Sequence, residues 1–219
     1  DLDNVCFAIC NTYKKNNNTL GVGPLKDGYL ISELCHKKEY KIFYFYDPSR
    51  DDFLKYLSIF IKNTKKNLMI YYSGRCTTIY KHHKDDTAIV FDEGYVNGEE
   101  LNTVLSNNWN KRSKIVLICD CFTGGSIWNL SFDKKQFPSF PSNVVSMYPV
   151  YNSTVPDMVK KAQKMHGIFT YYLCKFINET IDFSPTTLTS EMDPSLERFN
   201  ISVMVESTNP YLESQSIFN

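Results

Sequence analysis

The chain has 219 residues, and its 24 basic and 24 acidic side chains give a formal net charge of zero. This length is sufficient for one domain with a complete hydrophobic core, so we expect a single domain over residues 1–219. A balanced charge gives no global field that would attract nucleic acid or an anionic membrane. No apolar run approaches the roughly 20 residues that span a bilayer. From the charge balance and this absence together, we expect no nucleic-acid partner and no membrane partner.

The seven cysteines are an odd number and lack the dense, regular spacing of a disulfide scaffold. Such usage predicts free thiols in a reducing compartment, and we therefore expect a cytoplasmic location. Two short basic runs, at residues 62–66 and 81–84, are predicted to be solvated surface charges.

Apolar periodicity predicts strands and helices that alternate along the chain. Strands are expected at residues 5–10, 41–46, 68–72, 88–91, 115–119, 144–150 and 201–206. Helices are expected at residues 27–36, 53–61, 97–105 and 167–177. Residues 73–86, 132–141 and 183–199 show no clear period and are expected to be loops.

Repeated strand–helix–strand units predict an α/β fold with a mostly parallel central sheet covered by helices on both faces. In such sheets, ligand-binding and catalytic groups gather beyond the carboxyl ends of the strands. Two apolar strands lead into segments that cross this edge, at residues 69–76 and 115–126. The functional residues are therefore expected there.

Six segments, in order, resemble motifs of the metacaspases, the caspase-fold cysteine peptidases found outside animals. They are Phe7–Tyr13 (first strand), Gly23–Gly28 (the Gly-Cys-x-Asn-Asp-Ala turn), Tyr72–Arg75 (Tyr-Ser-Gly-His), Lys114–Asp120 (the strand entering Asp-x-Cys-His-Ser-Gly), Gly167–Tyr171 (Gly-x-Phe-Thr-Tyr) and Ser216–Phe218 (last strand). The resemblance implies a single caspase-like, three-layer sandwich over residues 1–219.

The two catalytic positions implied by the resemblance carry unsuitable residues. An alignment without gaps places Phe122 at the nucleophile position and Arg75 at the histidine position. Phenylalanine has no nucleophilic atom, and a guanidinium stays protonated at ordinary pH, so it neither accepts nor usefully donates a proton. This register predicts a degenerate dyad.

A second register deletes one residue after Asp120 and places Cys121 at the nucleophile position. Peptide cleavage then still requires an imidazole to protonate the leaving amine. His82 and His83 in the following loop are the candidates for that role.

The resemblance places Asp27 at an acidic position that helps metacaspases bind a basic substrate side chain. Pro24 replaces the neighbouring cysteine, and residues 146–152 are apolar or neutral where the family has a later acidic residue. We therefore expect a single carboxylate at this site. Asp27 fits a helix N-terminal cap equally well.

Many metacaspases use calcium, and the matching region of this chain contains Asp85, Asp86, Asp92 and Glu93. Calcium requires roughly 6 to 8 oxygen ligands, of which these side chains supply part. They also fit the solvated surface of an exposed strand. We expect no cofactor other than this possible calcium, and the Cys and His spacing supports no zinc site.

The leading hypothesis is a catalytically inactive metacaspase-like pseudopeptidase that acts as a regulatory or binding module. Its expected partner is a protein or peptide, and in particular an active metacaspase. The alternative hypothesis is an active endopeptidase that cleaves after Arg or Lys, with Cys121 as nucleophile and a displaced histidine as base.

Overall fold

The computed structural model describes residues 2–15, 19–81, 84–121, 126–130, 140–151 and 166–218. Its strands are β1 (Asn4–Cys10), β2 (Lys41–Tyr46), β3 (Asn67–Ser73), β4 (Cys76–Lys81), β5 (Lys84–Phe91), β6 (Gly94–Asn97), β7 (Lys114–Asp120), β8 (Val144–Tyr151) and β9 (Ile201–Ser207). Its helices are α1 (Gly23–Lys37), α2 (Arg50–Asn63), α3 (Gly98–Asn108), α5 (Ile168–Glu179) and α6 (Pro185–Leu196), with short 3-10 turns at Glu197–Phe199 and Pro210–Ser214.

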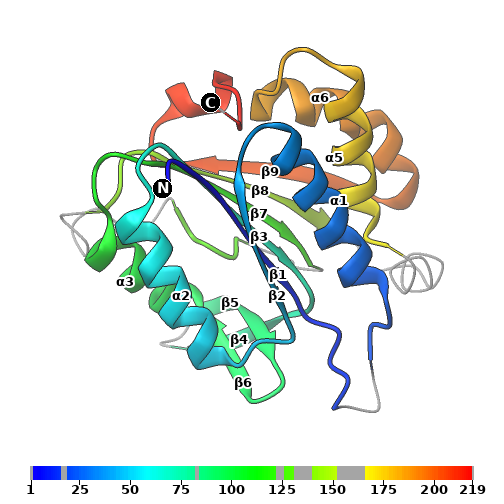
Figure 1. Ribbon diagram of the computed structural model, residues 1–219. Helices are drawn as coiled ribbons and strands as arrows, with labels where there is room; N and C mark the ends of the chain where they lie inside the picture. Colours follow the sequence, from blue (N-terminus) through cyan, green and yellow to red (C-terminus); the bar gives the residue numbers. More distant parts are fainter. Residues whose placement is uncertain are drawn as a thin grey trace.

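The central sheet has six strands in the order β2-β1-β3-β7-β8-β9. The first five strands run parallel, and β9 pairs antiparallel with β8. Helices α1, α5 and α6 cover one face, and α2 and α3 cover the other (Figure 1). The expected α/β sandwich with a mostly parallel sheet is confirmed.

Alternation along each central strand divides its side chains between two hydrophobic cores. In β3, Met69 and Tyr71 pack with α1 and α5, whereas Leu68, Ile70 and Tyr72 pack with α2 and α3. We call these sides the α1/α5 face and the α2/α3 face. Because both faces are covered, the strands are apolar throughout, which is why sequence reasoning located them well.

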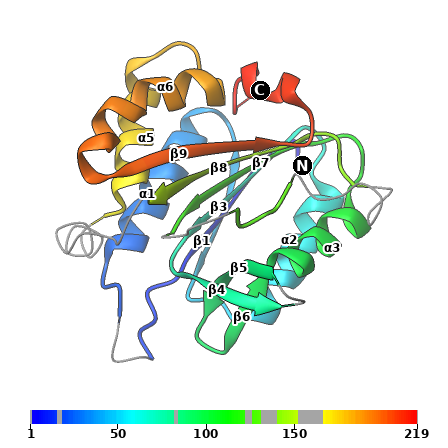
Figure 2. The same ribbon diagram turned by 180° about the vertical axis from the view of Figure 1, so that it is seen from behind.

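A second sheet, β4-β5-β6, is antiparallel and was not predicted. Residues 73–86 were expected to be a loop, but they contain β4 and the start of β5, so that expectation was wrong. Thr77, Thr78 and Tyr80 of β4 are exposed, so the strand lacks the apolar pattern on which the prediction depended. Figure 2 shows this small sheet beside α2 and α3, at one end of the central sheet.

Helix α6 also lies in a segment that was expected to be a loop. Its Thr, Ser and Asp residues have low helix propensity, and Pro194 is inside the helix. The helix is stabilised by burial of Leu188, Met192 and Leu196, which share one helical face. Tertiary packing outweighed local propensity here.

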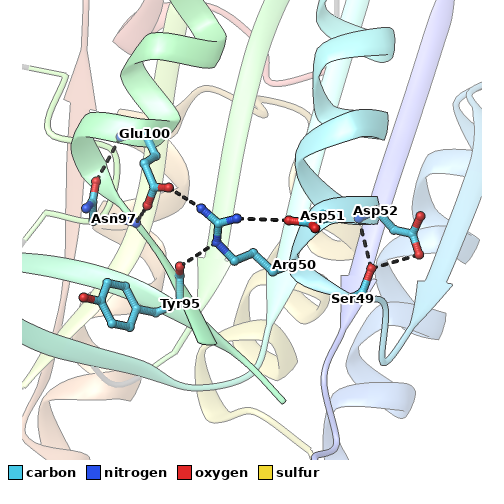
Figure 3. A network of polar contacts seen from close by, with 7 residues as sticks. All are labelled: Ser49, Arg50, Asp51, Asp52, Tyr95, Asn97 and Glu100. Carbon is cyan, nitrogen blue, oxygen red and sulfur yellow. Dashed lines mark hydrogen bonds and ion pairs between the residues drawn. The ribbon is translucent and has the colours of Figure 1, made fainter. Parts of the chain in front are cut away.

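A polar network joins the small sheet to the α2/α3 face (Figure 3). Arg50, at the start of α2, pairs with Glu100 of α3, and its Nε donates to the carbonyl of Tyr95 in β6 at 3.1 Å. Glu100 also completes a capping box with Asn97, the N-cap residue of α3. This network fixes the ends of α2, α3 and β6 relative to one another.

No helix within the described residues is both long and apolar enough to cross a membrane. All seven cysteines lie in the described part of the chain and are free thiols.

Candidate functional site

The carboxyl ends of β1, β3 and β7 meet at one edge of the central sheet, as the sequence predicted. The parallel register places Ser73 beside Asp120, and Cys10 beside Ser73. Polar side chains at this edge divide between the two faces of the sheet. Asp120 lies on the α1/α5 face, and Cys121 packs into the core of the α2/α3 face.

On the α1/α5 face, two buried carboxylates lie at the N-terminus of α5. Asp120 Oδ2 accepts hydrogen bonds from the Thr170 backbone nitrogen at 3.0 Å and from Thr170 Oγ1 at 2.6 Å. Both Asp27 oxygens accept from the Gly167 nitrogen at 2.8 Å, and Ser73 Oγ donates to Asp27 Oδ2 at 3.3 Å. The positive end of the α5 dipole also favours negative charge at this position.

Gly167 is the N-cap residue of α5, and it brings the two carboxylates together. A Cβ at this position would lie 1.9 Å from Asp120 Oδ2 and 3.0 Å from Asp27 Oδ2, so only glycine fits without rearrangement. Because glycine has no side chain to cap the helix, the Asp120 carboxylate accepts from the Thr170 nitrogen in place of an N-cap side chain.

The expectation of a single carboxylate is therefore wrong, since Asp120 is the second one. Burial is the main reason why the pKa of Asp27 rises to about 8, and the nearby Asp120 charge raises it further. Burial likewise raises the pKa of Asp120, while its hydrogen bonds from Thr170 oppose the rise. The pair thus favours retention of a proton at neutral pH.

Asp27 does not cap α1, the helix to which it belongs, but it does accept a hydrogen bond at the N-terminus of α5. Asp27 lies in the second turn of α1, whose N-cap is Val22, and it binds the N-terminus of α5 instead. The cavity beside it, which Pro24 and Gly74 also line, has a volume of about 10 Å³, or about one water. A substrate contact by Asp27 stays a prediction, and it requires this cavity to open.

On the α2/α3 face, Arg75 is fixed by a pair of buried tyrosines. Its backbone nitrogen donates to Tyr13 Oη at 2.7 Å, its carbonyl accepts from Tyr72 Oη at 2.8 Å, and its guanidinium lies 4.7 Å from the centre of the Tyr13 ring. The two tyrosine hydroxyls are 3.0 Å apart, and both reach the carbonyl of Val90. Burial raises the pKa of both tyrosines, so both remain neutral.

Gly74, which precedes Arg75, allows these hydroxyls to approach the chain. A Cβ on Gly74 would lie 2.6 Å from Tyr72 Oη and 2.8 Å from Tyr13 Oη. The resemblance included Gly74, Arg75 and Tyr13, but nothing in the sequence indicated that Tyr13 contacts Arg75, because the two residues are distant along the chain. Tyr13 has a positive φ of 58°.

Cys121 is fully buried among apolar side chains of the α2/α3 face. Burial raises the pKa of its thiol well above the ordinary value, and its contact with the Cys76 thiol raises it further. A thiol in this environment stays protonated and is inaccessible to a peptide. Phe122, His82 and His83 lie outside the described residues, so the structure does not place the other members of either proposed dyad.

The calcium candidates are spread along the small sheet. Asp86 lies in β5 next to Gly98, whereas Asp92 and Glu93 follow the end of that strand, about 15–20 Å farther along an extended chain. Glu93 pairs with Lys15 at 3.1 Å. Within the described residues, no three His, Cys, Asp or Glu side chains are placed to hold a metal, and the side chain of Asp85 lies outside them.

Comparisons with known proteins define the class to which this arrangement belongs. The model of the caspase domain family matches residues 3–218, so the chain belongs to the caspase domain family. No curated protein sequence matches.

Two solved structures show the same fold. Protein GSU0716 from Geobacter sulfurreducens is 11% identical with a TM-score of 0.71, and the match covers 99% of this chain and 98% of that one. The Drosophila initiator caspase Dronc is 13% identical with a TM-score of 0.65, and the match covers 100% of this chain and 82% of that one. At these identities the likeness shows the fold alone.

Proposed function

We propose that this chain is a metacaspase-like pseudopeptidase that binds a protein or peptide partner without cleaving it. The observation that carries the proposal is the environment of Cys121, whose thiol is fully buried on the face of the sheet opposite the paired carboxylates. Cleavage requires an accessible thiolate next to an imidazole. Arg75 occupies the position that the resemblance assigns to the histidine, and its guanidinium stays charged.

The side on which Cys121 lies supports the register without gaps. In the family motif Asp-x-Cys, the acid and the nucleophile are two residues apart, so an extended chain directs both to the same face. Asp120 and Cys121 lie on opposite faces here. Cys121 does not satisfy that pattern, whereas Phe122 occupies the matching position in the sequence.

An apolar groove on the α1/α5 face, beside the helix that carries Asp27, supports a binding role. It has a volume of about 350 Å³, and its lining includes Val22, Tyr29 and Tyr171. The exposed fractions of Val22 and Tyr29 are 51% and 65%, so both side chains are accessible to a partner. In our proposal, an active metacaspase binds here and its activity changes.

Peptide turnover tests the first half of the proposal. The purified chain is incubated with fluorogenic peptides that end in Arg or Lys, with and without calcium, beside a Cys121→Ala variant. We expect no turnover from either protein. Turnover that Cys121→Ala abolishes would establish the alternative, an active peptidase with Cys121 as nucleophile and His82 or His83 as base.

Restoring the dyad tests the register directly. The double variant Arg75→His/Phe122→Cys is treated with an electrophilic peptide ending in Arg, and the modified residue is located by mass spectrometry. We expect labelling at the new cysteine and none in the parent chain. Labelling of Cys121 in the parent would favour the register with a deletion.

The second half of the proposal is tested by adding the chain to an active metacaspase and measuring that enzyme's turnover. We expect the parent chain to change the enzyme's turnover and the Val22→Asp/Tyr29→Asp variant to leave it unchanged. The control variant Tyr211→Asp, at another exposed tyrosine, should act like the parent chain. An unchanged rate with the parent chain would contradict a regulatory role.

A further inference from the structure

Two basic segments meet at the amino end of the central sheet, opposite the candidate functional site. Residues 62–66 include the end of α2 and lead into β3, and residues 109–113 follow α3 and lead into β7. Asn110 Nδ2 connects them by donating to the carbonyls of Ile61, Lys62 and Thr64 at 3.0, 2.9 and 2.7 Å. In Figure 1 the ends of α2 and α3 lie at this end of the sheet, toward the N-terminus.

A pocket of about 560 Å³ lies between the two segments. Its lining consists of three basic side chains, four asparagines, a threonine and a tryptophan. These are Lys62, Asn63, Thr64, Lys65, Asn107, Asn108, Trp109, Asn110 and Arg112. None of these lining residues is acidic, and the volume falls within the range of about 300–1,000 Å³ typical of small-molecule sites.

Other groups already satisfy carbonyls at the C-terminal ends of the two helices. Asn110 donates to the carbonyls of Ile61 and Lys62 in α2, and the Trp109 nitrogen donates to the carbonyl of Leu105 in α3 at 3.0 Å. Among the described residues, the side chains of Lys62 and Arg112 form no ion pair, whereas Lys66, which follows Lys65 in the chain, pairs with Asp3 at 2.7 Å. Positive charge therefore remains available at the pocket.

Two further polar atoms of the pocket residues are buried without a hydrogen-bond partner among the described residues. They are Trp109 Nε1 and Thr64 Oγ1. Buried polar atoms without partners are uncommon, because each loses its hydration without compensation. Three cationic side chains and four asparagine amides that line the same pocket are suited to an acceptor-rich, negatively charged ligand.

We propose that this pocket binds a small phosphate ester that carries two or more negative charges. Arg112 presents a planar set of donors that matches phosphate, Lys62 and Lys65 add charge, and the asparagine amides supply neutral donors. The basic residues surround one concave site in a chain of zero net charge, which favours a small ligand over a nucleic acid. The site lies about 20 Å, the length of β3, from the carboxyl edge and is independent of the proposed pseudopeptidase role.

Binding is measured by isothermal titration calorimetry with two probes, inorganic tripolyphosphate and ATP, which separate phosphate recognition from contacts with a base or sugar. The test variant is Lys62→Gln/Arg112→Gln. The control, Lys55→Gln/Lys175→Gln, removes the same charge from exposed residues outside the pocket. Thermal unfolding verifies that both variants fold.

We expect the parent chain to bind at least one probe, the pocket variant to bind it about tenfold more weakly or worse, and the control to match the parent. Equal weakening by both variants, or no binding of either probe up to about 1 mM, would overturn the proposal. A 20-nucleotide RNA that binds more tightly than both probes through Lys62 and Arg112 would overturn it in favour of nucleic acid.

Discussion

The two faces of the sheet at its carboxyl edge stabilise buried polar groups in different ways. On the α1/α5 face, Asp27 and Asp120 are ionisable, and they depend on backbone nitrogens at the start of α5. On the α2/α3 face, Tyr13, Tyr72 and Cys121 stay neutral because burial raises their pKa values. The stability of the first face should therefore respond to pH and to the position of α5, whereas that of the second should not.

The largest effect is expected at Gly167, where the carboxylates approach α5. Gly167→Ala places a Cβ 1.9 Å from Asp120 Oδ2, so either α5 or the carboxylate must move. We expect a loss of about 2–4 kcal/mol in the free energy of unfolding, measured by urea denaturation.

Gly98→Ala is the matched control, because Gly98 also begins a helix and its added Cβ would be 3.1 Å from the nearest atom, Asp86 Oδ1. Its loss should be much smaller. If both variants lose the same stability, close approach at Gly167 is not what constrains this end of the sheet. Adding Asp120→Ala to Gly167→Ala should cost less than the sum of the single changes, because it removes the clashing group.

The next effect concerns pH. The pKa of Asp27 rises from 3.8 to about 8 on folding, so between these values the folded state holds a proton that the unfolded state releases. The resulting stability is fully present below pH 3.8 and is lost as the pH rises through 8. Asp27→Asn, which carries no titrating proton, should flatten this decline by on the order of 2–4 kcal/mol between pH 5 and pH 8.

Thermal or urea unfolding at several pH values provides the measurement for Asp27→Asn. The control is Asp51→Asn, which changes an exposed carboxyl at the start of α2. Parallel pH profiles of the parent chain and Asp27→Asn would show that the pair does not retain a proton in the folded state.

Sequence reasoning located the edge of the sheet better than the chemistry at that edge. Buried strands such as β7 follow from their apolar runs, and the rule for parallel sheets then placed Arg75 and Asp120 at the same edge. The pairing of Asp27 with Asp120 through Gly167 was missed, because it joins three segments that are distant in the sequence. The Asp120 carboxylate comes from β7 and caps α5, so the sequence around α5 contains no capping residue that would have indicated it.

The burial of Cys121 was missed for a related reason. Every second residue at the end of β7 faces the α2/α3 core, but no apolar pattern after Asp120 indicated that the alternation continues to Cys121. The small sheet, α6 and the basic pocket likewise depend on contacts between segments. The two basic runs that meet at the pocket lie apart in the sequence, and one of them was interpreted as ordinary surface charge.

The smallest predicted effect is a difference in stability between two tyrosine variants of β3, one on each face of the sheet. Tyr71 and Tyr72 are neighbours in β3, and each buries a bonded hydroxyl: Tyr71 Oη lies 2.7 Å from Thr170 Oγ1, and Tyr72 Oη lies 2.8 Å from the carbonyl of Arg75. Replacing either by phenylalanine should cost about 1 kcal/mol. Because Thr170 Oγ1 also donates to Asp120, Tyr71→Phe should cost more as the pH rises and the acid pair ionises.

The loss in Tyr72→Phe should be the same at pH 5 and pH 8, since its partners do not titrate in that range. Urea unfolding of both variants at the two pH values makes the comparison, with Tyr211→Phe as the exposed control. Identical pH profiles for Tyr71→Phe and Tyr72→Phe would remove the distinction between the faces. A steeper profile for Tyr71→Phe alone would locate the titrating charge beneath α5, because only that tyrosine is linked to the carboxylates.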